Sequence, residues 1–138
     1  MANFYTEFCA VEKISISHFQ LEPCKLKYTI AFDQRHLTQI LWNLCKNGWD
    51  HSQKQIASVN LSCVEIGKNS LSIEINDDGA GVAELDRARL FEPFFTTKNT
   101  GNGLGLYISR ELAEANGASL QYRALTQGSA FVIHLKKA

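Results

Sequence analysis

A run of residues from Leu90 to Ser109, LFEPFFTTKNTGNGLGLYIS, combines the groups that a phosphate-rich ligand would need. Gly101, Gly103 and Gly105 alternate with single residues, and glycine lets a backbone approach a bulky anion closely. The apolar pattern that follows predicts a helix, and the first N–H groups of a helix attract anions. Lys98, in the turn just before the glycines, adds a mobile positive charge. The spacing predicts a lid segment that closes over the phosphates of a nucleotide.

Two better-known phosphate motifs do not match this run. The P-loop requires a glycine, four further residues and then Gly-Lys-Ser or Gly-Lys-Thr, and the chain contains no such sequence. The dinucleotide-binding fingerprint requires a third glycine where Leu106 stands, and a strand where the polar TTKNT lies. A glycine-rich surface loop is also compatible with the run taken alone, so other motifs must decide between the two interpretations.

A second candidate lies on the helix predicted from the cap at Asp33 to about residue 51. At about 100° per residue, Asn43, Lys46, Asn47 and Asp50 fall within one polar stripe that flanks the apolar face. Amide and carboxylate oxygens can coordinate a hard cation together with its bound phosphates. A solvated helix face would produce the same pattern, so the stripe alone is ambiguous.

A third candidate ends the strand predicted over residues 70–76. Its apolar residues alternate on one face, and Asp77 continues that face by the two-residue period of a strand. A carboxylate aimed from the apolar side needs a hydrogen-bond donor, and the exocyclic amine of adenine would provide one. Gly79 and Gly81 then predict a tight turn that a ligand can approach closely. The alternative is an ordinary Asp-Asp-Gly turn at the end of a strand.

Composition excludes several classes of function. Lysine plus arginine and aspartate plus glutamate number 14 each, and this zero net charge argues against a dedicated nucleic-acid surface. No apolar run approaches the roughly 18 residues of a membrane span, and the first residues do not begin a signal peptide. The four cysteines include no C-x-x-C pair, which favours reduced core thiols over a metal site. We therefore expect a cytosolic protein.

The patterning predicts an α+β fold. A length of 138 residues suits one domain, for which we expect residues 11–138, preceded by a leader over residues 1–10. Strands are expected near residues 14–21, 25–32, 55–66, 70–76, 119–124 and 129–136, and helices near 33–51, 84–90 and 104–116. The last helix should turn Leu104, Ile108, Leu112 and Ala115 inward. Paired strands at both ends indicate one mostly antiparallel sheet that helices cover on one face.

Taken together, the three candidate segments resemble the ATP-binding catalytic domain of bacterial sensor histidine kinases. That domain belongs to a wider family with gyrase, the Hsp90 chaperones and the MutL mismatch-repair proteins. LWNLCKNGWDHS resembles its N box, DDGAGV its first glycine box, LFEPFFTTK its phenylalanine box and GNGLGL its second glycine box. GSAFVIHL resembles its terminal glycine-containing strand, so the resemblance covers about residues 25 to 136. WNLCKN together with LYISRELAEANGASL looks closest to the PilS-type sensors of type IV pilus regulation, and nitrogen-sensor kinases are similar.

This resemblance implies a two-layer sandwich of a mixed sheet and three helices, with ATP and Mg²⁺ between the helices and the lid. Asn47 would hold Mg²⁺, Asn43 would assist near the phosphates, and Asp77 would bind the adenine amine. Thr97 and Lys98 would steady the lid, and Asn43, Asn47 and Lys98 form the implied catalytic group. The implied nucleotide contacts are Asn43, Asn47, Asp77, Gly79, Gly81, Val82, Thr97, Lys98, Gly101, Gly103, Leu104, Gly105 and Leu106.

The resemblance also implies a partner. Kinases of this type phosphorylate a histidine, followed by an acid, on a separate dimerisation hairpin of two helices. No histidine in this sequence is followed by an acid, so we expect the acceptor outside this chain, in a longer homodimeric and membrane-anchored sensor that signals to a response regulator. Asp50 departs from the pattern, because many relatives carry a basic phosphate contact there.

Two other functions compete with this interpretation. A serine-directed kinase of the anti-sigma-factor type would use the same nucleotide site, mainly to bind a protein partner. An ATPase of the gyrase or chaperone type would need a carboxylate at Asn43 to activate water, and the amide found there argues against hydrolysis.

Overall fold

The computed structural model describes residues 2–21, 30–96 and 103–137. Within these described residues, five strands form one sheet in the order β1-β2-β3-β5-β4. The strands are β1 (Phe19–Leu21), β2 (Val59–Ile66), β3 (Ser70–Asp77), β4 (Ser119–Ala124) and β5 (Ser129–Lys136). The helices are α1 (Ala2–Val11), α2 (Gln34–His51), α3 (Glu84–Arg87) and α4 (Gly105–Ala115), with a 3₁₀ turn η1 (Ile16–His18). Each pair of neighbouring strands is antiparallel except β1 and β2, so the sheet is mixed.

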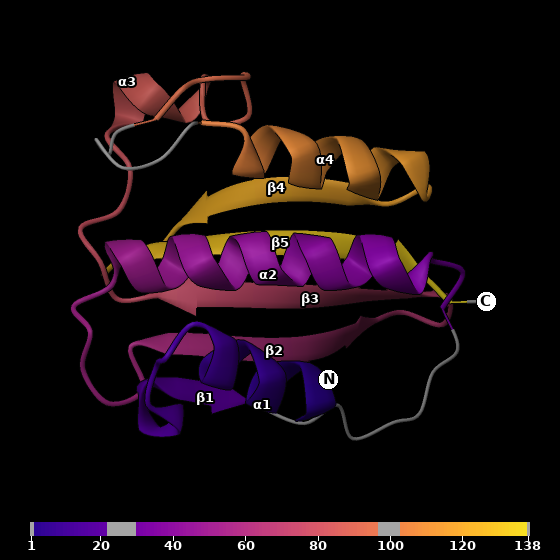
Figure 1. Ribbon diagram of the computed structural model, residues 1–138. Coiled ribbons are helices and arrows are strands. Elements are labelled where there is room, and N and C mark those ends of the chain that lie inside the picture. Colours follow the sequence, from indigo (N-terminus) through magenta and orange to yellow (C-terminus); the bar gives the residue numbers. More distant parts are fainter. Residues whose placement is uncertain (1, 22–29, 97–102, 138) are drawn as a thin grey trace.

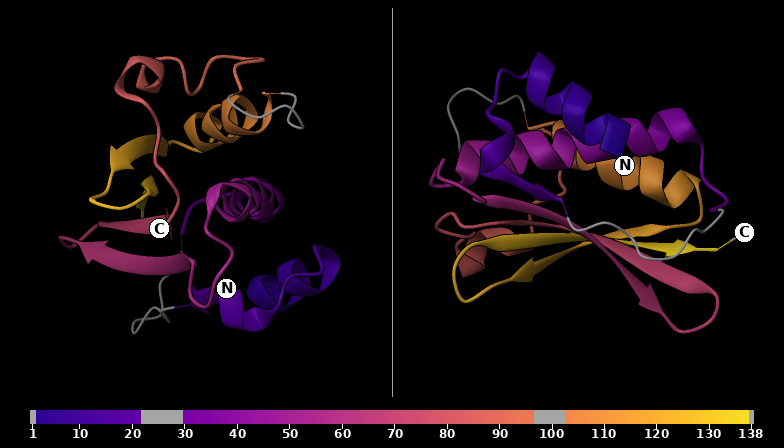
Figure 2. Two further views of the ribbon diagram at one scale, coloured as in Figure 1. Left: turned by 90° about the vertical axis from the view of Figure 1, so that its left-hand side faces the viewer. Right: turned by 90° about the horizontal axis from the view of Figure 1, so that it is seen from below.

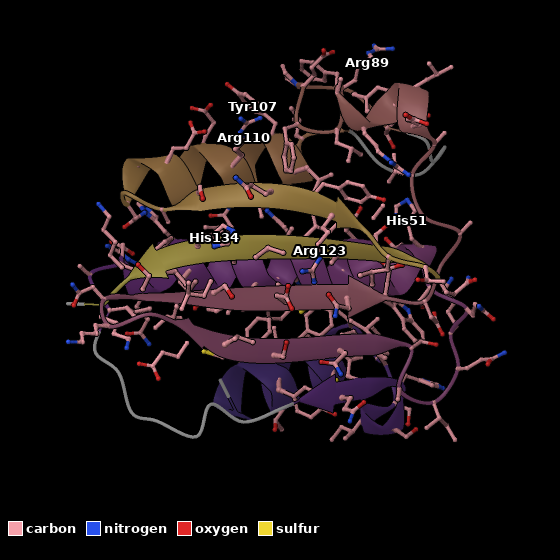
Figure 3. All side chains as sticks on the ribbon, turned by 180° about the vertical axis from the view of Figure 1, so that it is seen from behind. His51, Arg89, Tyr107, Arg110, Arg123 and His134 are labelled. Carbon is pink, nitrogen blue, oxygen red and sulfur yellow. The ribbon has the colours of Figure 1, made fainter. Side chains whose placement is uncertain are left out.

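Helices α1, α2 and α4 cover one face of this sheet (Figures 1 and 2). In the part of the chain that the structure describes, no helix covers the opposite face, which carries Arg123 and His134 (Figure 3). On that face the Arg123 guanidinium lies 2.6 Å from the Glu74 carboxylate. The α+β sandwich expected from the sequence is therefore confirmed, because alternating strands bury one face against amphipathic helices.

Several element boundaries also agree with the sequence, and others differ. The two C-terminal strands coincide with the expected ranges 119–124 and 129–136. The expected strand over 14–21 is reduced to η1 and the three-residue β1. Most of the expected strand over 25–32 lies outside the described residues, and Ile30 forms an isolated bridge with Lys137.

Helix α1 occupies the segment that the sequence predicts to be a leader. Phe8 and Cys9 of this helix are 1% and 3% exposed, in the same core as the sheet. The Phe8 ring packs edge-on against Phe19 and Trp42, with ring centres 5.3 and 5.1 Å away. Residues 2–11 are thus a packed helix of this fold, because their aromatic side chains find partners on β1 and α2.

Helix α2 lies in the middle of the helical layer and begins as predicted at Asp33. The Asp33 carboxylate accepts hydrogen bonds from the backbone N–H groups of Arg35 (2.8 Å) and His36 (3.2 Å). These bonds satisfy donors that have no partner within the helix. The buried residues of α2 are Ile40, Leu41, Leu44, Cys45 and Gly48.

Helix α4 packs beside α2, and its orientation differs from the expected one. Ser109 and Ala113 are its fully buried residues, whereas Ala115 is exposed, so the inward direction predicted for Ala115 is wrong. Ser109 is buried because its hydroxyl donates to the Gly105 carbonyl (2.7 Å) and accepts from the Asn43 amide (3.2 Å) of α2. The contact with α2 therefore sets the rotation of α4.

Candidate nucleotide-binding site

An open cavity of about 240 Å³ lies between α2, the start of α4 and the adjoining ends of β3 and β5. Its lining residues are Trp42, Asn43, Lys46, Asn47, Asp50, His51, Asp77, Val82, Leu90, Phe95, Thr96, Gly103, Gly105, Leu106, Ser129 and Phe131. All three candidate segments of the sequence therefore contribute to one cavity. Figure 1 shows why this is possible, since α2 and α4 lie side by side, α2 over β3 and β5 and α4 along β4.

Asp77 supplies a buried carboxylate to the cavity wall. It ends β3, whose residues Leu71, Ile73 and Ile75 are buried on the helix-covered side, and it is itself 5% exposed. Its Oδ1 accepts a hydrogen bond from the Gly79 N–H at 2.9 Å. Burial raises the pKa of the Asp77 carboxyl above its usual value, and the Gly79 N–H and nearby His51 oppose that rise. A ligand that donates a hydrogen bond would relieve the desolvation of this group.

The neighbouring acid, Asp78, does not line the cavity and binds a loop instead. Its Oδ1 accepts from the Gln53 backbone N–H (2.9 Å), and its Oδ2 accepts from the Ser58 hydroxyl (2.8 Å). Both oxygens are thus used to hold the loop between α2 and β2. The alternation of the strand places only Asp77 on the cavity side.

The polar stripe of α2 lines the cavity, as the helical spacing predicts. The Asn43 amide donates to the Gly105 carbonyl at 3.4 Å and to the Ser109 hydroxyl at 3.2 Å, so it joins α2 to the start of α4. The Asn47 side chain has no hydrogen-bond partner among the residues that the structure describes. His51, also at the cavity, has its Nδ1 2.8 Å from the Asn47 carbonyl. An N–H at Nδ1 would leave Nε2 of a neutral His51 as an acceptor.

The start of α4 also faces the cavity, through Gly103, Gly105 and Leu106. Its N-cap residue is Leu104, whose side chain offers no acceptor for the first N–H groups of the helix. Such N–H groups and the helix dipole favour a negative group. The remaining predicted lid residues Thr97, Lys98 and Gly101 lie outside the described residues.

Close backbone contacts require glycine at two positions of the site, and the sequence does not reveal these contacts. Gly103 has φ +72°, and a Cβ there would lie 2.4 Å from the Phe94 carbonyl carbon. A Cβ on Gly79 would lie 2.0 Å from the His51 carbonyl oxygen. Gly79, Gly81 and Leu104 are not among the described residues that line the cavity. They shape the turns beside it.

The sequence did not predict several of the residues that line the cavity. Ser129 begins β5 directly opposite Asp77, and it is 5% exposed. The Tyr122 hydroxyl lies 3.2 Å from Ser129 Oγ and accepts a hydrogen bond from the Val82 N–H at 3.2 Å. The only signal for Ser129 was its place after Gly128 in the terminal strand, and its nearness to Asp77 depends on the pairing of β3 with β5.

The phenylalanine-rich segment before the lid divides its side chains between the core and the surface. The Phe91 ring lies edge-on to Phe131, with ring centres 6.3 Å apart, whereas Phe94 is 74% exposed. The guanidinium groups of Arg110 and Arg89 lie over the rings of Phe91 (5.1 Å) and Phe95 (4.7 Å), respectively. These contacts hold the segment beside α4, where Phe95 and Leu90 wall the cavity.

The fold and this cavity define a nucleotide-binding domain in which a buried acid, a polar helix face and a helix N-terminus meet. The family model "Histidine kinase-, DNA gyrase B-, and HSP90-like ATPase" matches residues 32–138, and the chain belongs to this family. Within it, the chain is a catalytic ATP-binding domain of the sensor histidine kinase type.

Individual relatives support this assignment. The sensor protein kinase PilS of Pseudomonas aeruginosa is 43% identical over 99 residues, which is 70% of this chain and 19% of PilS. The sensor histidine kinase ZraS of Salmonella typhimurium is 32% identical over 107 residues, 77% of this chain and 23% of ZraS. The chain thus spans about a fifth of the length of these relatives.

Solved structures agree on the fold. The mycobacterial sensor histidine kinase MprB superposes with a TM-score of 0.80 over 99% of this chain and 94% of that chain, at 22% identity. A full-length ShkA structure in complex with AMPPNP superposes with a TM-score of 0.75 over 99% of this chain and 30% of that one, at 26% identity. None of the helices in the described part of the chain is long and apolar enough to cross a membrane.

Proposed function

We propose that this domain binds ATP and transfers its γ-phosphate to a histidine on a separate helical hairpin of a longer sensor. The observation that carries the proposal is Asp77, a carboxylate buried in the wall of a cavity that also receives a helix N-terminus. An acid that needs a donor suits the adenine amine, and N–H groups that need an acceptor suit phosphates. The names of PilS and ZraS as sensor kinases support the same function.

The proposed roles follow the positions of the side chains. Asp77 accepts the hydrogen bond of the adenine amine, and the first turn of α4 with Gly103 and Gly105 faces the phosphates. Asn47 offers its amide oxygen to Mg²⁺, which would neutralise phosphate charge, and Asn43 fixes α4 beside it. Among the described residues no group of three or more His, Cys, Asp or Glu side chains could hold a metal alone. Asn47 therefore suits a cation that is bound chiefly through the phosphates of the nucleotide.

Asn43 also favours transfer to a protein over hydrolysis. Its amide cannot take a proton from water, and its NH₂ group is already donated to Gly105 and Ser109. The attacking group should therefore be supplied by a partner. We propose that this partner is the dimerisation hairpin of a cytosol-facing sensor, which passes the phosphate to a response regulator.

The proposed function predicts labelling only when an acceptor is supplied. The domain incubated with γ-labelled ATP and Mg²⁺ should not label itself, but it should label a histidine-containing hairpin of a PilS-type sensor added in trans. Transfer should be slow, because a tether normally supplies a millimolar effective concentration. Acid-labile label on the hairpin is the expected result, and Asp77→Asn should reduce it. Acid-stable label on serine, or phosphate release without an acceptor, would contradict the proposal.

A further inference from the structure

Few positive charges that could balance a nucleotide's phosphates come from the described residues of the cavity. Among the described residues that line it, Lys46 is the only lysine or arginine, and Asp50 and Asp77 are both acids. Asp77 lies at the end of β3, whereas Lys46 lies with Asn43 and Asn47 on the polar stripe of α2. The positive charge of Lys46 is thus placed on the wall that the proposed function assigns to the phosphates.

Lys46 is held loosely by two carboxylates. Its Nζ lies 3.4 Å from Glu12 Oε2 and 3.6 Å from Asp50 Oδ1, and its side chain is 46% exposed. Charge-assisted hydrogen bonds are usually about 2.7–2.9 Å long, so both contacts are weak. By contrast, Lys137 approaches Glu65 to 2.6 Å and Arg123 approaches Glu74 to 2.6 Å. The Lys46 ammonium group can therefore move at little cost.

Glu12 is fixed in place independently of Lys46. Its other oxygen, Oε1, accepts a hydrogen bond from the Trp42 indole N–H at 2.9 Å. The Trp42 ring is in turn packed against Phe8 of α1, and Trp42 lines the cavity. Glu12 would stay beside the cavity after Lys46 turned away, and its charge would then repel a phosphate.

We propose that Lys46 binds the nucleotide phosphates and that Glu12 and Asp50 hold its ammonium group when no nucleotide is bound. This inference rests on the proposed nucleotide site and adds a phosphate contact to it. A triphosphate carries several negative charges close together, so it attracts the ammonium group more strongly than two separate carboxylates do. The two carboxylates should consequently oppose ATP binding, while Lys46 should favour it.

The test compares ATP with adenosine, which lacks phosphates. Calorimetric titrations should show that Lys46→Gln weakens ATP binding by about threefold to tenfold, whereas adenosine binding stays unchanged. Glu12→Gln should strengthen ATP binding by about twofold or more, again without changing adenosine binding. Lys46→Arg keeps the charge and should retain most of the affinity. The matched control is Lys68→Gln, in the exposed turn between β2 and β3, at the opposite end of these strands from Asp77.

The outcomes separate this inference from the proposed function. If wild type binds adenosine and ATP but Lys46→Gln binds both as wild type does, the inference is overturned and the nucleotide site stands. Equal weakening of ATP and adenosine would mean that Lys46 only supports the fold, which also overturns it. If wild type binds neither ligand, the proposed function fails and this inference fails with it. Raising the salt concentration should reduce ATP affinity more in wild type than in Lys46→Gln.

Discussion

At the scale of single residues, the site depends on one acid of an adjacent pair. Asp77 and Asp78 are chemically identical, yet Asp77 faces the cavity and Asp78 binds the backbone of Gln53 and the hydroxyl of Ser58. The two-residue period of β3 causes this difference. Burial of the Asp77 charge is only partly offset by the Gly79 N–H, and a ligand that donates a further hydrogen bond would offset it more, which is why Asp77 marks the adenine end of the proposed site.

The raised pKa of Asp77 predicts a pH dependence of binding. The adenine amine donates a stronger hydrogen bond to the ionised carboxylate than to the neutral acid, so acidification through the raised pKa should weaken adenosine binding. The weakening should begin above the range in which an ordinary aspartate is protonated. Titrations from about pH 7 downward, into the range in which an ordinary aspartate is protonated, would measure it. Adenosine is the suitable ligand because it carries no titrating phosphate.

Asp77→Asn is the control for this profile. Its remaining adenosine binding should show no such loss on acidification, because the amide does not titrate there. In the absence of ligand, the raised pKa should also make the wild-type fold lose stability as pH rises from the ordinary aspartate value to the raised one. A fall in affinity that is equal in wild type and Asp77→Asn would assign the titration to another group.

At the scale of secondary-structure elements, the start of α4 rests on two glycines with different requirements. Gly103 has positive φ and lies against the Phe94 backbone, whereas a Cβ on Gly105 would find its nearest neighbour, Asn43 Cγ, at 4.0 Å. We predict that Gly103→Ala destabilises the domain by more than about 1 kcal/mol. Gly105→Ala should be neutral or stabilise it by up to about 1 kcal/mol. Denaturant unfolding of both variants would measure this, and equal destabilisation would contradict the distinction.

Helix α2 contains a glycine that the packing does not require. A Cβ on Gly48 would lie 3.6 Å from Val59 Cγ1 and 3.7 Å from Asp77 Cβ, which are ordinary contact distances. Gly48→Ala should therefore raise the free energy of unfolding by about 0.5–1 kcal/mol, because alanine restricts the unfolded chain and favours helix. Urea denaturation would measure the gain. A loss of stability would show that the space beside Asp77 is tighter than described.

At the scale of the whole molecule, long periodic patterns were predictable and long-range packing was not. The sequence predicts α2, β3, β4 and β5 because each repeats its apolar residues over two or more turns or pleats. It also predicts Asp77 and the polar stripe, since both follow from local periods. It does not predict Ser129 at the cavity, because that position depends on the register between β3 and β5.

The same reason explains the two main differences from expectation. Helix α1 is held by the rings of Phe19 in β1 and Trp42 in α2, and α2 lies far from it in the sequence. Helix α4 buries Ser109 and Ala113 because it packs beside α2, and a helical pattern alone cannot show which neighbour it meets. Contacts between distant segments thus fix both the extent of the helical layer and the rotation of its members.

Nucleotide titration tests most directly whether this cavity binds ATP with adenine against Asp77. Wild type should bind ATP with Mg²⁺ and bind GTP more weakly, because guanine presents an oxygen to the carboxylate where adenine presents an amine. Asp77→Asn should bind ATP about tenfold or more weakly, as expected for a buried hydrogen bond to a charged group. Undiminished ATP affinity in Asp77→Asn, or equal binding of ATP and GTP by wild type, would contradict the account.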